Sequence, residues 1–357
     1  MKPVCFFGAW DPEYPRNRIL REGLRLAGVD VLACRVRERR VLFRYPALVL
    51  AFARRGARAG CILVPEFRHK DMPLARWLAG GRRVVFDPLV SRHDTLVGDW
   101  GLHARGSFQA RWNLAIDRLA LARADLVLCD TWAHGALFER LGVPRARLER
   151  VLVGAEAMFF AVPPAAPAPP VRIAYVGGFL PLHGTRTMVE ALARLEREHG
   201  LPEFRCELAG KGIECDAARE QARAAGLART ELTGPVPYAE SPGVLARAHI
   251  VLGAFGAGEK AGRVIPHKVY QGLAAGRAVV TGDGEGLREV FEHDRHLHAV
   301  PRGDAEALAA ALSRLIRDAA LRERLGACGQ ARAREVATPE RIGRGLHAAL
   351  ENLERAR

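Results

Sequence analysis

The stretch VRIAYVGGFLPLHGTRTMVEALARL, residues 171–195, contains the structural unit that recurs along the chain. Residues 171–178 form an apolar run that ends in two glycines, which is typical of a buried strand. A helix is predicted from Thr185, and the residues in between form a short loop. Strand, loop and helix in this order are the repeating unit of parallel sheets covered by helices.

The same alternation is found on both sides of this stretch. In the first half the predicted strands are PVCFFGA, DVLACRV, CILVPE, RRVVFDP and ADLVLCD, with helical segments such as NRILREGLRLAG and SFQARWNLAIDRLALARA between them. In the second half they are VRIAYVGG, CELAG, TELTG, IVLGAF and RAVVTGD, with helices from about Thr185, Asp216, Tyr238, Pro266 and Leu287. From Gly303 onward the sequence is almost entirely helical.

A proline-rich segment separates the two halves. AVPPAAPAPP, residues 161–170, contains five prolines and is typical of a stiff, extended linker. We therefore predict an α/β fold of two Rossmann-like, doubly wound parallel-sheet domains that face a cleft, at residues 1–162 and 171–337, with a linker at 163–170. Ligands of such sheets bind beyond the carboxyl ends of the strands, so the loops that directly follow strands are the candidate sites.

Composition restricts the class of protein. No apolar run reaches the ~20 residues needed to span a bilayer, and MKPVCFFGAW has none of the three regions of a signal peptide. The seven cysteines are scattered without a C-x-x-C pair, which favours a reducing compartment and argues against a zinc site. We expect a cytoplasmic protein.

The net charge of +14 is unevenly distributed. Residues 35–58 contain eight arginines and one glutamate around the apolar run VLFRYPALVLAF. A basic amphipathic helix of this kind can lie on an anionic membrane, here the inner membrane face, but an ordinary surface helix with solvated arginines has the same composition. Nucleic acid is not expected as a partner, because no basic strand is interleaved with aromatic residues.

The loop after the first predicted strand is GAWDPEYPRNRIL, residues 8–20. It lacks the G-x-G-x-x-G pattern of dinucleotide-binding domains. Its two prolines deliver Arg16 and Asn17 to a helix start, where anions or sugar hydroxyls can bind, and Asp11 and Tyr14 lie in the same loop. The alternative is that this loop only caps the helix.

In the second half, GGFLPLHGTRT follows a strand directly. Gly177 and Gly178 would let a ligand approach the backbone closely. Gly184 and Thr185 open the next helix, whose first amides can receive a phosphate, and His183 stands beside them. His183 is therefore a candidate ligand contact, although a lone histidine is more often structural.

A second candidate is RVIPHKVYQGLAAGRAVVTGD, residues 263–283. Pro266 suits a first helical turn. His267 and Lys268 then place cations at the positive end of a helix dipole, which is unfavourable unless an anion binds there. Lys260 and Arg263 lie just upstream, and the glycine-rich GAFGAGEKAG before them is expected to be a mobile loop that folds over a ligand.

These residues carry a resemblance to a known family. VGGFLPLHGTRTMVEALARL and RVIPHKVYQGLAAGRAVVTGDGEGLREVF resemble the donor-binding half of GT-B glycosyltransferases of the retaining family that includes sucrose synthases and bacterial mannosyltransferases (family GT4). FGAWDPEYPRNRILREGLRLAG, VVFDPLVSRHDTL and ADLVLCDTWAHGALF are similar to a bacterial subgroup of that family. The resemblance implies a nucleotide-diphosphate sugar held by the second domain, an acceptor held by the first, and a C-terminal helix, residues 338–357, that packs back on the first.

The resemblance also implies site residues and the absence of a metal cofactor. Gly177, Gly178, His183 and Gly184 would form the diphosphate loop, and Lys268 would lie against the sugar nucleotide, with Gly234 to Val236 facing the base. The remaining predicted donor contacts are Lys211, Lys260, Arg263, Ile265, His267 and Gln271. In the first domain Asp87, at the end of a strand, and His93 and Asp94 close behind would orient the acceptor.

The chain departs from the family pattern at three places. Gly178 and His183 stand where the usual loop has arginine and lysine. The usual Glu-x7-Glu pair falls on Arg263 and Gln271, so sugar recognition must differ and the ribose partner is weaker. In the first domain, Asp87 stands where a histidine often lies beneath the sugar.

The predicted function is retaining transfer of a sugar from a nucleotide-diphosphate sugar to a hydroxyl of a glycan, lipid-linked or small-molecule acceptor. Lys268, Arg263, His183 and helix amides would stabilise the leaving diphosphate. Two alternatives stay open: a nucleotide-sugar epimerase, which needs no acceptor, and a non-catalytic basic membrane-binding protein on a degenerate GT-B fold, which would release no nucleotide diphosphate.

Overall fold

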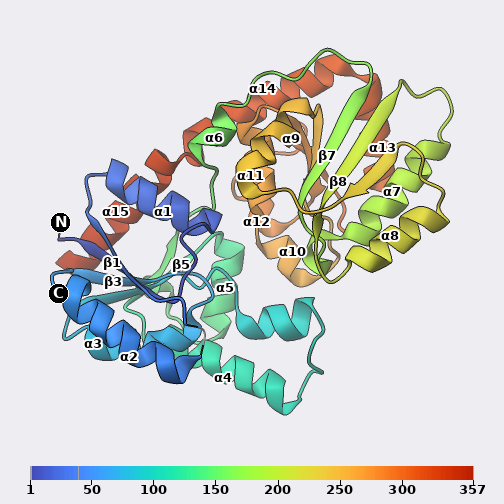
Figure 1. Cartoon of the computed structure of the whole chain (residues 1–357). Helices are drawn as coiled ribbons and strands as arrows, with labels where there is room; N and C mark the ends of the chain where they lie inside the picture. Colours follow the sequence, from blue (N-terminus) through green and yellow to red (C-terminus); the bar gives the residue numbers. More distant parts are fainter. Residues whose placement is uncertain (1, 39, 357) are drawn as a thin grey trace. The chain divides into compact units, whose positions relative to one another are not determined.

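The computed structural model describes residues 2–38 and 40–356. The chain divides into two α/β units, one of residues 1–153 together with 339–357 and one of residues 154–338 (Figure 1). The boundary expected at residue 162 and the segment 163–170 thus lie inside the second unit. The C-terminal helix α15, Pro339–Arg355, belongs to the first unit.

The first unit is built on a six-stranded parallel sheet in the order β2-β1-β3-β4-β5-β6. Helices α1 and α15 pack on one face of the sheet, and helices α2, α3, α4 and α5 pack on the other. The strands are β1 Val4–Gly8, β2 Val31–Arg35, β3 Cys61–Val64, β4 Arg83–Phe86, β5 Leu126–Cys129 and β6 Leu148–Arg150. The helices are α1 Pro15–Leu26, α2 Val41–Ala51, α3 Met72–Leu78, α4 Phe108–Ala122 and α5 Trp132–Arg140, with π turns at Phe52–Gly56 and Asp94–Asp99.

The second unit has a six-stranded parallel sheet in the order β12-β11-β10-β7-β8-β9. Its largest core packs apolar side chains of β7, β8, β10 and β11 against α7, α8 and α13. The strands are β7 Val171–Gly178, β8 Phe204–Lys211, β9 Thr230–Thr233, β10 Ile250–Leu252, β11 Ala278–Gly282 and β12 His298–Val300. The helices are α6 Ala157–Phe160, α7 Thr185–Arg197, α8 Cys215–Ala224, α9 Ser241–Arg247, α10 Glu259–Arg263, α11 His267–Ala274, α12 Glu285–Arg288, α13 Ala305–Arg317 and α14 Ala319–Val336.

The α/β architecture predicted from the sequence is confirmed, and each predicted strand is present. Two further strands, β6 and β12, each of three residues, were not predicted. The proline-rich segment packs on the second unit, where Arg277 donates to the carbonyl of Pro163 and the His249 ring bonds the carbonyl of Ala166. Within residues 2–38 and 40–356, none of the helices has the length and apolarity that crossing a bilayer requires.

Two glycines let α1 and α15 approach closely in the first unit. A Cβ at Gly23 would lie 2.4 Å from the carbonyl oxygen of Pro339, and a Cβ at Gly343 would lie 1.9 Å from the carbonyl oxygen of Gly23. Both distances are far below van der Waals contact, so the two backbones can lie this close only where neither residue has a side chain.

This contact predicts a position-specific effect within one helix. Gly343→Ala forces α1 and α15 apart, and we expect it to lower the free energy of unfolding by roughly 1–3 kcal/mol. The matched control is Gly345→Ala, where a Cβ meets nothing within 4 Å and the gain in helix propensity should stabilise by up to about 1 kcal/mol. All five tryptophans lie in the first unit, so urea unfolding followed by tryptophan fluorescence reports on it. Equal effects of the two substitutions would contradict the packing described.

Candidate active site

The strand β7 ends in the predicted glycine pair, where two side chains form hydrogen bonds to the backbone. The carbonyl oxygen of Gly178 accepts hydrogen bonds from the Tyr175 hydroxyl (2.5 Å) and from Nδ1 of His183 (2.6 Å). Gly178 also pairs in register with Lys211 at the end of β8. The loop after β7 is therefore fixed by its own strand, and the neighbouring strand end brings Lys211 beside it, exposed.

The loop after β7 is joined to the loop after β10. The amide of Phe255 donates to the carbonyl of His183 (2.9 Å), and the amide of Gly256 donates to the carbonyl of Leu182 (3.1 Å). Gly184 has φ +65°, and a Cβ there would lie 2.6 Å from the Phe255 carbonyl carbon. The expectation of a mobile glycine-rich loop is wrong for residues 253–256, which are buried and bonded; only residues 257–259 are exposed.

Lys268 lies against this loop from the first turn of α11. Its Nζ donates to the Tyr175 hydroxyl (3.1 Å) and stands 4.5 Å from the centroid of the Tyr175 ring. A Cβ on Gly177 would come within 2.8 Å of that Nζ, so the missing side chain leaves room for the lysine. The predicted convergence of the glycine loop, His183 and Lys268 is what the geometry shows, because β7 and α11 both end or begin at the carboxyl edge of the sheet.

The environment of Lys268 is unfavourable for its charge. The residue is only 7% exposed, and burial holds its pKa well below the ordinary value of a lysine. It also stands at the positive end of the α11 dipole. Among residues 2–38 and 40–356 no carboxylate forms an ion pair with Lys268, so a bound anion would favour its charged form.

Further basic groups surround Lys268. Lys260 and Arg263 of α10 are buried, and Arg263 donates to Glu259 (3.0 Å). Burial lowers the pKa of His183 most strongly, and the charges of Lys268 and Lys260 lower it further, so these three groups lie within electrostatic reach of one another. This environment favours the neutral form of His183.

The amide of Gly184 does not serve as the predicted phosphate donor, because it donates to the carbonyl of Pro181 (3.0 Å). The next amides, from Thr185 onward, belong to the first turn of α7, which has no intrahelical acceptors for them. The Thr185 hydroxyl is fully buried, and among the described residues it has no hydrogen-bond partner. The amide donors of the site therefore begin at Thr185.

The other predicted donor contacts line the same edge of the sheet. Gln271 donates to the Tyr238 hydroxyl (3.1 Å), which in turn bonds Glu156. The sequence analysis did not select Tyr175, Tyr238 or Glu156. Tyr175 has the position of a core residue in a strand, and Tyr238 and Glu156 belong to no recognisable motif. The remaining positions are Ile265, buried before α11, His267, half-buried in its first turn, and Val236, half-buried in the loop after β9.

In the first unit, Arg16 and Asp87 form a buried ion pair. Nε and Nη2 of Arg16 donate to the two carboxylate oxygens of Asp87 (2.9 and 3.1 Å), and Nη1 donates to the carbonyls of Val151 and Leu152. Both side chains are essentially inaccessible. The prediction that Arg16 receives an anion is therefore wrong, and Asp87 is occupied by Arg16 rather than turned toward an acceptor.

Glu66, which the sequence analysis did not select, lies beside this pair. It follows β3, is buried, and is hydrogen-bonded by Asn17, whose Nδ2 also donates to the carbonyl of Asp11 (2.6 Å). Burial and the charge of Asp87 raise the pKa of Glu66 to about 8, and burial likewise raises the pKa of Tyr14. Asp11 itself is exposed.

His93 and Asp94 belong to a different group of contacts. The His93 amide donates to Asp117, and the Asp94 amide donates to Ser91 Oγ. Both side chains are half-buried at the start of the π turn Asp94–Asp99. They stay candidates for the acceptor.

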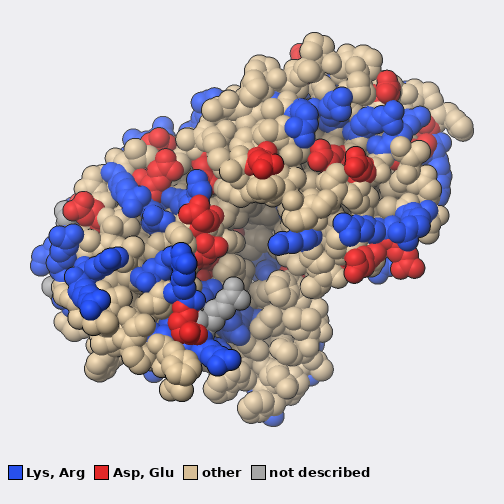
Figure 2. All heavy atoms as spheres, in the orientation of Figure 1, with Lys and Arg blue, Asp and Glu red and all other residues tan. Residues whose placement is uncertain are grey.

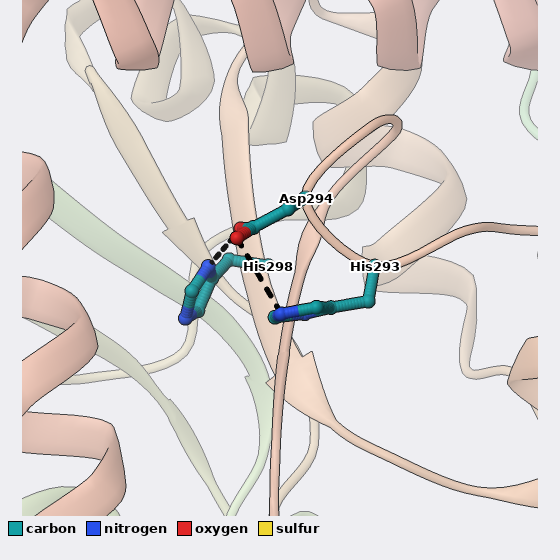
Figure 3. Close-up of side chains that lie close together, drawn as sticks. All are labelled: His293, Asp294 and His298. Carbon is teal, nitrogen blue, oxygen red and sulfur yellow. Dashed lines mark hydrogen bonds and ion pairs between the residues drawn. The ribbon is translucent and has the colours of Figure 1, made fainter.

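His293, Asp294 and His298 form a compact cluster in the second unit (Figure 3). His298 Nδ1 lies 2.6 Å from one Asp294 oxygen, and His293 Nε2 lies 3.5 Å from the other. The amide of Ala299 donates to Nδ1 of His293, so a neutral His293 carries its proton on Nε2 and cannot ligate a metal there. Arg314 also pairs with Asp294 (3.2 Å). Hydrogen bonding accounts for this cluster without an ion.

A hollow of about 680 Å³ lies elsewhere in the second unit, lined by Arg172, Arg205 and Arg247 among others. Arg172 and Arg205 stand near the amino ends of β7 and β8. Because ligands of parallel sheets bind at the carboxyl ends, we place the candidate site at Gly177 and Lys268 rather than in this hollow.

The raised pKa of Glu66 predicts a pH-dependent stability. A group whose folded-state pKa lies above its unfolded value stabilises below the unfolded pKa and loses that contribution as pH rises through the folded one. Between about pH 5 and about pH 9 the wild type should therefore lose unfolding free energy, and Glu66→Gln should lose less. The exposed Glu13→Gln serves as control, with urea unfolding and tryptophan fluorescence as readout. Identical pH profiles of wild type and Glu66→Gln would contradict a buried, protonated Glu66.

The candidate site lies in a part of the chain that matches a known family model. Residues 170–318 match the family model described as glycosyl transferases group 1. No curated protein matches the chain in sequence.

Solved structures match over nearly the whole chain. HepE of Anabaena, solved with UDP and glucose, is 16% identical, with a TM-score of 0.73 over 99% of this chain and 100% of that one. A sucrose-phosphate synthase from Thermosynechococcus elongatus is 17% identical, with a TM-score of 0.73 over 100% of both chains. The lipopolysaccharide outer core galactosyltransferase WaaB is 12% identical, with a TM-score of 0.68 over 99% of both. The chain thus has the GT-B fold, and Gly177, His183 and Lys268 lie in the segment 170–318 that matches the glycosyl transferases group 1 model.

Proposed function

We propose that the chain is a glycosyltransferase that moves a sugar from a nucleotide-diphosphate sugar to an acceptor hydroxyl, with retention at the anomeric carbon. The observation that carries the proposal is Lys268, buried at the start of α11 and packed against the Gly177 backbone, where a side chain would collide with it. A diphosphate is the ligand whose charge suits this site. HepE, which has the same fold, has been solved with UDP-glucose, in line with such a donor.

The basic groups around Lys268 would stabilise the leaving group. In the reaction the bond between the anomeric carbon and the diphosphate oxygen breaks, and its electron pair leaves with the diphosphate. A bond forms between that carbon and the acceptor oxygen, whose proton passes to the departing diphosphate. Lys268, Lys260 and Arg263 would offset the charge that builds on the diphosphate, together with amides of the first turn of α7. These cations would stabilise the leaving diphosphate as a metal ion does in metal-dependent enzymes, so we propose a metal-independent reaction.

The nucleoside and sugar contacts follow from the neighbouring side chains. Gln271 is hydrogen-bonded to the Tyr238 hydroxyl, which is bonded to Glu156, and would contact the ribose. The Glu156 carboxylate would then act on the ribose partner indirectly, through the Tyr238 hydroxyl. Arg263 is an obligate donor and would contact sugar oxygens or phosphate only as a donor. On the acceptor side, Glu66, His93 and Asp94 are the candidates that remain, because Asp87 is paired with Arg16. The acceptor would be a glycan, a lipid-linked molecule or a small molecule in the cytoplasm.

Lys268→Met should lower turnover by about 10²–10³ at unchanged thermal stability, because one donor to the leaving group is lost. The substitution should also abolish the uptake of protons that we expect on UDP binding. In the wild type the pKa of Lys268 is lowered in the empty site and rises when a diphosphate binds, so UDP binding takes up protons. Calorimetry in buffers of different ionisation enthalpy measures this uptake. Lys70→Met in the first unit is the control, and normal turnover in Lys268→Met would refute the role assigned to Lys268.

The reaction class is tested by incubating the chain with UDP- and GDP-sugars and following the products by NMR. The proposal expects nucleotide diphosphate release that depends on an acceptor, continues in the presence of a chelator, and gives a product with the anomeric configuration of the donor. Interconversion of the sugar nucleotide without acceptor would instead establish an epimerase, and the absence of release with every donor would establish a non-catalytic protein.

A further inference from the structure

Large exposed apolar side chains are concentrated in one part of the first unit. Eleven such side chains are exposed in the described chain, and only Leu26 and Ile213 lie outside residues 42–119. The other nine are Leu42, Phe43, Leu50, Phe67, Trp77, Leu102, Phe108, Trp112 and Leu119. Isolated exposed apolar residues are ordinary, whereas nine in fewer than eighty residues are a concentration whose position in the fold calls for an explanation.

Most of these side chains belong to three helices on the same face of the sheet. The inner sides of α2, α3 and α4 contribute Leu48, Ala75 and Leu121 to one core, so their outer sides point away from the same face. Leu42 (77% exposed) lies on α2, Trp77 (72%) on α3 and Phe108 (68%) on α4. We call the outer sides of these helices the α2–α4 surface.

The exposed charged residues between residues 40 and 124 are all basic. Residues 40–124 contain fifteen lysines and arginines and six acidic residues. Of the six, four are buried and two half-buried, and none is exposed: Glu66, Asp71, Asp87 and Asp117 are buried, Asp94 and Asp99 half-buried. Figure 2 shows blue and tan atoms without red over the part of the first unit labelled α4 in Figure 1.

The helix α2 carries apolar side chains on its outer side as well as on its inner side. Arg44 turns inward and pairs with the buried Asp71 (2.7 Å), while Leu42, Phe43 and Leu50 face solvent. Because Leu48 packs into the core on the inner side, α2 is apolar on both sides, and the interpretation of residues 35–58 as an ordinary surface helix with solvated arginines does not account for it. Beyond its end, Arg54, Arg55 and Arg58 are exposed and line a hollow of about 350 Å³, in which a phosphate group can be received.

On α4, aromatic and basic side chains alternate along the exposed side. The rings of Phe108 and Trp112 stack with their centroids 6.5 Å apart, and Arg111 and Arg118 are exposed beside them. Aromatic rings flanked by arginines are the side chains enriched at the level of lipid headgroups. The sequence analysis considered only residues 35–58, because the apolar side of α4 also contains buried residues and shows no unusual local charge.

We propose that the α2–α4 surface docks on an anionic lipid bilayer, with Phe43, Trp77, Phe108 and Trp112 entering the headgroup layer. Charge complementarity favours this occupant: each cation near an anionic leaflet contributes about 1 kcal/mol, and within residues 40–124 no carboxylate is exposed to oppose it, the nearest exposed one in the sequence being Glu38 before α2. A fluid bilayer also accommodates bulky side chains spread over three helices without a matching shape. The proposal stands whether or not the chain transfers sugars, and it would bring such an enzyme to a lipid-linked acceptor.

Vesicle flotation of the full chain tests the proposal. The chain should float with vesicles of phosphatidylcholine mixed with phosphatidylglycerol at low salt, and only weakly with phosphatidylcholine alone. Phe108→Ser combined with Trp112→Ser should lower the bound fraction at least about tenfold, as expected when two buried aromatic rings are lost. Leu26→Ser combined with Ile213→Ser removes the same kind of exposed side chain elsewhere and should leave flotation unchanged.

The charge contribution is tested in the same assay. Replacing Arg54, Arg55 and Arg58 with Glu should release the chain from mixed vesicles, while the same change at the exposed Arg197, Arg219 and Arg223 of the second unit should have a much smaller effect. Three outcomes would overturn the proposal: no flotation with either vesicle, equal losses in both triple variants, or a dimer in light scattering that the Phe108 and Trp112 substitutions dissociate while vesicle binding is absent.

Discussion

The arrangement of the candidate site depends on a buried lysine at the positive end of a helix. Lys268 is removed from water, points at the Tyr175 hydroxyl and lies across Gly177, and its pKa is lowered accordingly. A protein maintains such a destabilised cation where a ligand restores its charge. The hydrogen bonds from Tyr175 and His183 to the carbonyl of Gly178, and the bonds between the loops after β7 and β10, hold the site in place before any ligand arrives.

The first unit also contains a buried cation, but there the protein itself supplies the counter-charge. There the buried guanidinium of Arg16 meets a buried carboxylate, Asp87, and two carbonyls, so its charge is satisfied by the protein itself. The neighbouring carboxyl group of Glu66 is not part of this ion pair. It avoids a buried unpaired charge by keeping its proton up to about pH 8. A satisfied pair fixes the loop after β1, whereas the unsatisfied lysine of the second unit is suited to binding.

The alternation of strands and helices could be predicted from the sequence because each strand is a short apolar run bounded by turn-forming residues. The sequence also predicted that the loop after β7 and the start of α11 meet, since both lie at the carboxyl edge of one sheet. It did not predict the pairing of Arg16 with Asp87, 71 residues apart, nor that Gly184 uses its amide within its own turn. The role of Tyr175 was missed because a tyrosine in a strand is usually a core residue. The exposed apolar side of α2 was missed because the inward orientation of Arg44 can be seen only in the folded structure.

The most direct test of this account is a crystal structure of the chain with UDP bound. The account predicts the β-phosphate within ion-pair distance of Lys268 Nζ and against Gly177, with amides from Thr185 onward donating to its oxygens. A diphosphate bound elsewhere, for example in the hollow at the amino ends of β7 and β8, with Lys268 still bonded to Tyr175 alone, would contradict it.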